Sequence, residues 1–95
     1  MTKSTIELPA VRRWHSPNGY RPVLIVKRGR KHLHVLALKG GKVRVVRLAV
    51  LEESLMRPLV AQGKPYPVAR AIKQVRFIAR ARGATGEAQA WLDRL

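Results

Sequence analysis

The chain has 95 residues, with 20 lysines and arginines against five acids, a formal net charge of +15 and 46% hydrophobic residues. This apolar share excludes a disordered basic tail, and the absence of cysteine excludes disulfides and thiolate metal sites. We expect one domain over 1–95, with a β-rich basic half over about 6–51 and a helical half over about 52–95.

The N-terminal segment lacks the basic region, apolar core and cleavage site of a signal peptide. No continuous apolar run is longer than that of Val23–Val26, which is far too short to span a membrane. We therefore expect a cytoplasmic protein without a membrane partner.

Apolar runs separated by turn residues predict four strands in the first half. They cover 11–15, 20–27, 32–38 and 43–50. The turn between the first two is Ser16-Pro17-Asn18-Gly19, and Val23–Val26 is typical of a strand covered on both faces. With Gly40-Gly41 as a two-residue turn, Leu38 faces Val43, and the pairs Leu36–Val45 and His34–Arg47 follow.

This register gives both faces of the sheet apolar side chains. One face collects Leu33, Val35, Val46 and Leu48, and the other collects Leu36, Leu38, Val43 and Val45. A sheet that is apolar on both faces is strongly bent or covered by helices. We expect an α+β fold, a bent antiparallel meander of four to five strands followed by two to three C-terminal helices. An SH3-like small barrel is one form of such a meander.

Helical signals fill the second half. Glu52-Glu53 predicts a short helix that ends near Pro58, and Pro67 begins a longer helix that Gly83 stops. A last helix runs from Thr85, as its N-cap, to the end. The long helix separates an apolar stripe from a basic flank, with Phe77 outside the stripe.

Long acid-free stretches keep the basic residues away from counter-charge, because no acid lies between Leu8 and Leu51 or between Ser54 and Gly86. Such a surface repels itself when compact, and nucleic acid is the leading partner because each neutralised phosphate releases counterions. We predict nucleic-acid contacts from Arg12, Arg13, Lys27, Arg28, Arg30, Lys31, Arg44, Arg47, Lys73, Arg76 and Arg80.

Two segments resemble DNA-binding motifs. Arg28-Gly29-Arg30 resembles the core of an AT-hook, without its flanking prolines, and implies contact with an A·T-rich minor groove. The alternative is a charged hairpin tip that discourages aggregation. The segment from Ile78 to Leu92 is similar to a helix-turn-helix, but Glu87 and Asp93 in its second helix would repel phosphates. A plain helical hairpin is therefore the favoured alternative.

We predict no metal and no catalytic site. His32 and His34 share a strand face without an evident third ligand, and no nucleophile with a base or phosphate-binding glycine motif is found. Trp14 and Tyr20 flank the first turn, where they stack on unpaired bases or anchor the core.

The resulting hypothesis is a non-enzymatic nucleic-acid-binding protein that needs no cofactor. We expect it to bind double-stranded DNA rather than RNA with limited sequence preference, as a nucleoid-associated transcription regulator or architectural protein. The alternative is a small regulator or inhibitor, of the kind that mobile elements such as phages encode, bound to an acidic surface of RNA polymerase or a nuclease.

Overall fold

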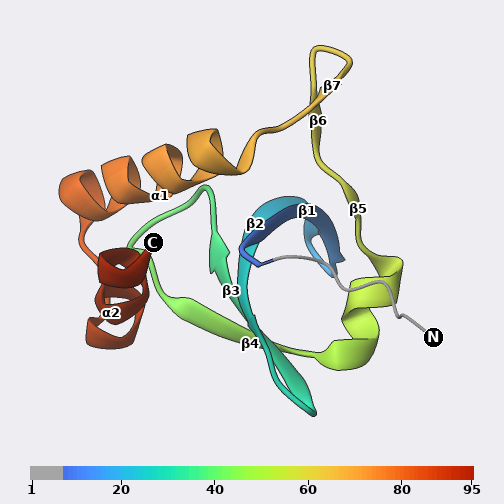
Figure 1. The fold of residues 1–95 in the computed structure, drawn as a ribbon, viewed down its shortest axis with the longest axis horizontal. Coiled ribbons are helices and arrows are strands. Elements are labelled where there is room, and N and C mark those ends of the chain that lie inside the picture. Colours follow the sequence, from blue (N-terminus) through green and yellow to red (C-terminus); the bar gives the residue numbers. More distant parts are fainter. Residues whose placement is uncertain (1–7) are drawn as a thin grey trace.

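The computed structural model of the protein describes residues 8–95. The predicted start of the β-rich half at residue 6, and most of the segment considered as a signal peptide, lie outside these residues. The structure confirms the α+β class, because an antiparallel meander precedes two α-helices (Figure 1). Within residues 8–95, neither helix is long and apolar enough to cross a membrane.

The sheet has five strands in the order β4-β3-β2-β1-β5. The meander consists of β1 (Ala10–Ser16), β2 (Gly19–Arg28), β3 (His32–Ala37) and β4 (Val45–Ala49). The 3₁₀ helix η1 (Val50–Leu55) carries the predicted pair Glu52-Glu53 but begins two residues before it, and the chain then continues into β5 (Arg57–Pro58), which pairs with β1. Since β4 and β5 form the two edges, the sheet is open, and the small barrel stays an interpretation of its curvature.

The predicted first turn is confirmed at the hairpin of β1 and β2. Ser16 pairs with Gly19, and the Ser16 hydroxyl donates to the Gly19 carbonyl over 2.7 Å while accepting from the Asn18 amide. Gly19 has a φ of 113°, a conformation that favours glycine. The turn therefore follows directly from the local sequence.

The predicted register of β3 and β4 is also confirmed, but the two-residue turn at Gly40-Gly41 is wrong. Leu36 pairs with Val45 and His34 with Arg47, as expected, yet β3 ends at Ala37 and β4 begins only at Val45. The intervening backbone has other partners. The Leu38 amide donates to the Pro22 carbonyl, and Val43 exchanges hydrogen bonds with Gly83 and Thr85 at the helix connection.

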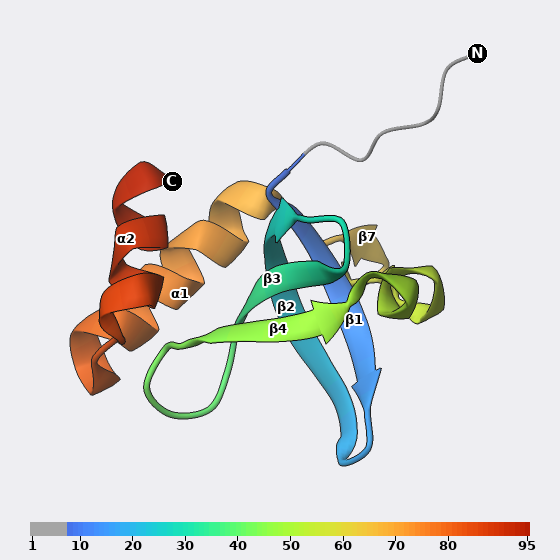
Figure 2. The ribbon, with the colours of Figure 1, turned by 90° about the horizontal axis from the view of Figure 1, so that it is seen from below.

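The sheet separates two hydrophobic clusters, as its two apolar faces predict. Val23 and Ile25 of β2 point to the face closed by η1, whereas Leu24 and Val26 point to the face covered by the helices. Figure 2 shows α1 and α2 on one side of the sheet and η1 on the other. The continuous apolar run in β2 is therefore explained by burial on both faces.

The two helices begin and end close to the predicted positions. Helix α1 (Val68–Arg82) has Pro67 as its N-cap and so begins one residue later than expected, and Gly83, with a φ of 93°, is its C-cap. Helix α2 (Gly86–Arg94) begins where the Thr85 hydroxyl accepts from the Ala88 amide over 3.2 Å. Between β5 and α1, the short strands β6 (Val60–Ala61) and β7 (Lys64–Pro65) form a projecting hairpin (Figure 1).

Candidate nucleic-acid interface

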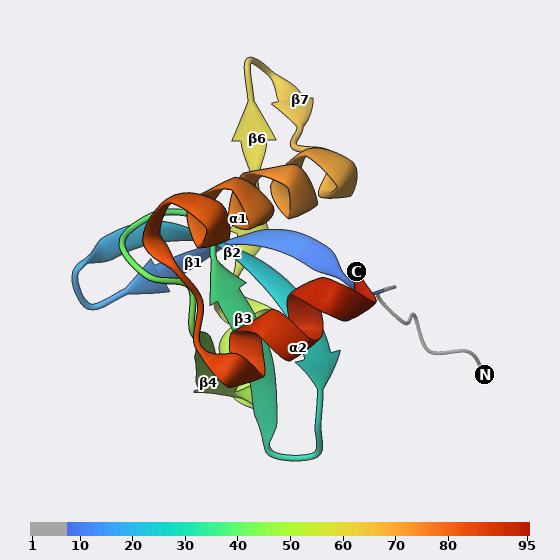
Figure 3. The ribbon, with the colours of Figure 1, turned by 90° about the vertical axis from the view of Figure 1, so that its left-hand side faces the viewer.

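The predicted basic residues do not gather on one surface. Figures 1 and 3 place the turn between β2 and β3 at the opposite end of the molecule from α1. The basic turn with Arg28, Arg30 and Lys31 is thus separated from the basic flank of α1. The contacts at each end therefore decide which cations are free to meet a ligand.

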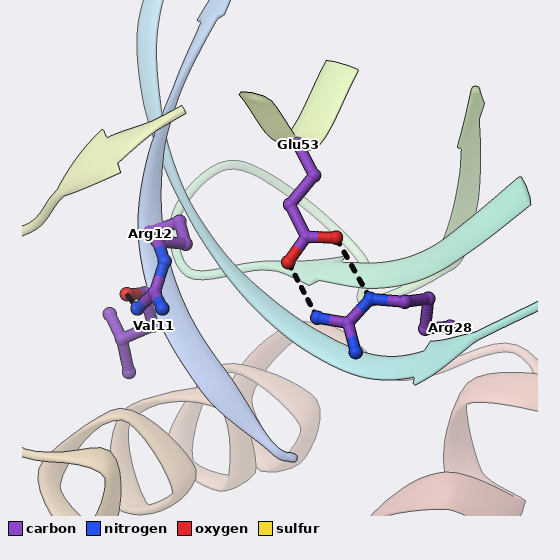
Figure 4. Close-up of polar contacts among 4 residues, drawn as sticks. All are labelled: Val11, Arg12, Arg28 and Glu53. Atoms are coloured by element: carbon purple, nitrogen blue, oxygen red, sulfur yellow. Dashed lines mark hydrogen bonds and ion pairs between the residues drawn. The ribbon is translucent and has the colours of Figure 1, made fainter. Parts of the chain in front are cut away.

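Arg28 is held inside the fold by Glu53 of η1. Its Nε and Nη2 atoms donate to the two carboxylate oxygens over 2.9 and 2.6 Å (Figure 4), and the two side chains are only 27% and 16% exposed. The hydrogen bonds with this carboxylate raise the pKa of Arg28, and those from Arg28 lower the pKa of Glu53. Arg28 therefore fastens the hairpin to η1 and contributes little free charge.

Gly29 also serves the turn itself. Its amide donates to the His32 carbonyl over 2.8 Å, and a Cβ at this position would lie 3.1 Å from the same oxygen. The close backbone approach that Gly29 allows is thus made within the chain. Of the predicted cations around this turn, Lys27, Arg30 and Lys31 are exposed, so the three-residue resemblance to an AT-hook has one free arginine.

The cations of β1 are partly engaged as well. Arg12 is half-buried and its Nη1 donates to the Val11 carbonyl over 2.7 Å (Figure 4). The guanidinium of Arg13 lies 4.3 Å from the ring centroid of Tyr20, which also stacks with His15. These contacts order the arginines but leave Tyr20 57% exposed.

The two aromatic residues beside the first turn have different surroundings. Trp14 packs against the cluster beneath η1, and its Nε1 donates to Glu52 over 3.1 Å. Trp14 therefore anchors the core, the second of the two roles considered for it. Tyr20 keeps the exposure that contact with a ligand requires.

Arg47 of β4 forms an ion pair with Glu87 in the first turn of α2. The two side chains are 50% and 45% exposed, so water screens this pair far more than the pair of Arg28. The contact turns Glu87 toward β4 and supports the interpretation of α1 and α2 as a helical hairpin. It also leaves Arg47 partly neutralised.

His34 lies opposite Arg47 in the ladder of β3 and β4. Burial lowers the pKa of His34, and the positive charges of Arg47 and Lys27 lower it further, while Glu87 acts in the other direction. The surroundings of His34 therefore favour its neutral form beside two cations. Among residues 8–95, no three His, Cys, Asp or Glu side chains gather as a metal site would need.

Helix α1 carries the clearest unneutralised charge. Its buried face holds Ala71, Val75 and Ile78, and the opposite side exposes Lys73, Phe77 and Arg80 at intervals of one turn. We call these three residues the outer face of α1. No carboxylate of the described residues lies within ion-pair distance of Lys73 or Arg80.

Arg76, the third predicted cation of α1, has a structural role. Its Nη2 donates to the carbonyls of Leu95 and Leu92 over 2.9 and 3.3 Å. These carbonyls lie at the end of α2, and the Leu92 carbonyl also accepts from the Leu95 amide over 3.3 Å. Arg76 therefore joins the two helices, and the basic flank is reduced to Lys73 and Arg80.

The loop between β3 and β4 contacts α1 and its C-terminal end. The Gln74 amide donates to the Leu38 carbonyl over 3.2 Å, and Val43 is bonded to Gly83. Lys42 and Arg44, on either side of Val43, are exposed next to the end of α1. Lys42 and Arg44 belong to the acid-free stretch between Leu8 and Leu51 of the sequence, but only the fold brings the predicted Arg44 close to α1.

No protein-family model, curated protein or solved structure matches the chain.

Proposed function

We propose that the protein is a non-enzymatic DNA-binding protein that contacts the phosphates of a duplex with limited sequence preference. The observation that carries this proposal is the uncompensated charge. The net charge is +15, and within residues 8–95 carboxylates form ion pairs with two of the cations, Arg28 and Arg47. A transcription regulator or architectural protein, nucleoid-associated in the cytoplasm, is the role that fits this activity.

A duplex suits the form of α1 better than a flexible single strand does. Its outer face is convex and is held rigidly against the sheet by Ala71, Val75 and Ile78. Lys73 and Arg80 project from it at fixed spacing, and the phosphates of a duplex are also regularly spaced. Because the helix is already ordered, its backbone loses little entropy when it meets a rigid row of anions.

The proposal is tested by fluorescence anisotropy with duplex DNA, single-stranded DNA and RNA over a salt series. If about four to six phosphates are neutralised, affinity for the duplex falls roughly 10²–10³-fold between about 50 and 200 mM salt. The duplex is expected to bind more tightly than single-stranded DNA or RNA. Affinity independent of salt, or no binding in dilute buffer, would overturn the proposal.

A second candidate function, binding to a protein partner, is supported by η1, in which the side chains of Leu51 and Leu55 are 82% and 66% exposed. They lie four residues apart, and the nearby positive field favours an acidic protein surface such as that of a polymerase or nuclease. A stoichiometric partner that survives nuclease treatment, and is lost with Leu51→Ala and Leu55→Ala together, would favour this function over DNA binding.

A further inference from the structure

Phe77 is an apolar side chain without a packing role in the described part of the chain. It is 67% exposed and belongs to neither hydrophobic cluster. Lys73 lies one turn before it and Arg80 one turn after it, on a helix that contains no acid. A ligand that covers this face must therefore offer negative charge next to an apolar or aromatic surface.

The major groove of duplex DNA has this arrangement. Rows of phosphates border it, and its floor presents base edges that include the C5-methyl groups of thymine. The groove is about 12 Å wide, and an α-helix with its side chains is about 10–12 Å across. From Lys73 to Arg80 the helix rises roughly 10 Å, close to three base-pair steps.

We propose that α1 enters the major groove and that Phe77 contacts thymine methyl groups, while Lys73 and Arg80 bind the bordering phosphates. This inference rests on the proposed DNA binding and adds a preference for thymine to it. It assigns the groove contact to α1, whereas the helix-turn-helix resemblance would assign it to α2. Glu87 of α2 is bound to Arg47, and Asp93 adds a further negative charge.

The geometry of α1 is consistent with this role. Figures 1 and 3 show α1 at the outside of the molecule, with one side on the sheet and α2 beside it. Arg76 faces α2, and Arg80 borders with it a hollow that Gln89 and Asp93 of α2 also line, so Lys73 and Phe77 form the part of α1 that projects farthest from α2. Lys42 and Arg44 lie at its C-terminal end, where the groove border would continue.

The test compares one duplex sequence with the same sequence in which uracil replaces thymine, which removes only the C5-methyl groups. We expect the unmodified protein to bind the uracil duplex about three- to fivefold more weakly for each methyl group contacted. Phe77→Ala should weaken binding to the thymine duplex on the order of tenfold. The affinities of this variant for the two duplexes should differ by less than about twofold. Phe77→Leu should keep most of the discrimination.

Two controls separate this contact from folding and from general apolar effects. Alanine is a better helix former than phenylalanine, so Phe77→Ala should keep the far-ultraviolet circular dichroism of the protein. Leu51→Ala removes a side chain of similar exposure from η1 and should change neither the affinity nor the discrimination. The salt dependence of Phe77→Ala should match that of the unmodified protein, since no charge is lost.

Each failure has its own signature. If the duplex binds with strong salt dependence but neither uracil nor Phe77→Ala changes the affinity, the inference is overturned and the proposed function stands. If Phe77→Ala weakens binding equally on both duplexes and a minor-groove ligand displaces the protein, α1 acts in the other groove and the inference is again overturned. If no nucleic acid binds, both proposals fail.

Discussion

The turn between β2 and β3 and the outer face of α1 are both basic, but their cations have different partners. At the turn, Arg28 is bound by both carboxylate oxygens of Glu53. On α1, Lys73 and Arg80 meet no carboxylate of residues 8–95. The density of positive charge along the sequence is therefore a poor guide to the charge that a ligand can reach.

The position of the few acids explains the difference. Glu52 and Glu53 lie together in η1, where they bind Trp14 and Arg28 of the first two strands. These acids hold η1 against the sheet and neutralise the nearest arginine. On α1, Lys73 and Arg80 form no ion pair among residues 8–95, so their charge is available for binding.

The largest expected effect comes from removing the free charge of α1. Lys73→Ala combined with Arg80→Ala should weaken duplex binding roughly 50-fold at about 0.1 M salt and reduce the salt slope by about 2. Anisotropy over a salt series measures both quantities. The matched variant carries Arg30→Ala and Lys31→Ala at the turn, and an equal loss in this variant would show that the two ends bind DNA alike.

The next effect concerns stability at the turn. Glu53→Gln leaves Arg28 half-buried without its carboxylate, and we expect the free energy of unfolding to fall by about 1–3 kcal/mol. Urea denaturation should show a lower midpoint with an unchanged m-value. An unchanged midpoint would mean that the pair does not fasten the hairpin to η1.

Most of the fold could be predicted because its signals are local. Alternation placed the strands, the Gly19 turn fixed the first hairpin, and Thr85 marked the start of α2. The Gly40-Gly41 turn failed because Val43 bonds to Gly83 and Thr85, whose proximity no local pattern reveals.

The candidate site was predicted less well than the fold. The basic residues of the site could be predicted from the charge pattern of the sequence. Whether each cation is free to bind a ligand depends on partners that are distant in the sequence. Arg28 is neutralised by Glu53, and Arg76 is bound to carbonyls at the end of α2. Phe77 was recognised as lying outside the apolar stripe, but its exposure between two cations required the structure.

A smaller effect is expected between the two ends, at His34. Its folded pKa lies below the ordinary value near 6.5, because of burial first and then the charges of Arg47 and Lys27. The unfolded chain therefore binds more protons in this range, and the free energy of unfolding should fall as pH drops through about 6.5 toward the folded pKa. Denaturation over about pH 5–7.5 should show a weaker dependence in His34→Gln than in the control His32→Gln. Equal dependence in both variants would contradict this role of His34.

The smallest effect separates the two ion pairs. Arg47 and Glu87 are about half exposed, so a double-mutant cycle with Arg47→Ala and Glu87→Gln should give a coupling energy of about 0.2–1 kcal/mol. The same cycle at Arg28 and Glu53 should give a larger value, because those side chains are less hydrated. High salt should remove most of the first coupling and less of the second. Equal couplings with equal salt sensitivity would mean that exposure does not distinguish the pairs, and the contrast between the paired Arg28 and the unpaired cations of α1 would lose its physical basis.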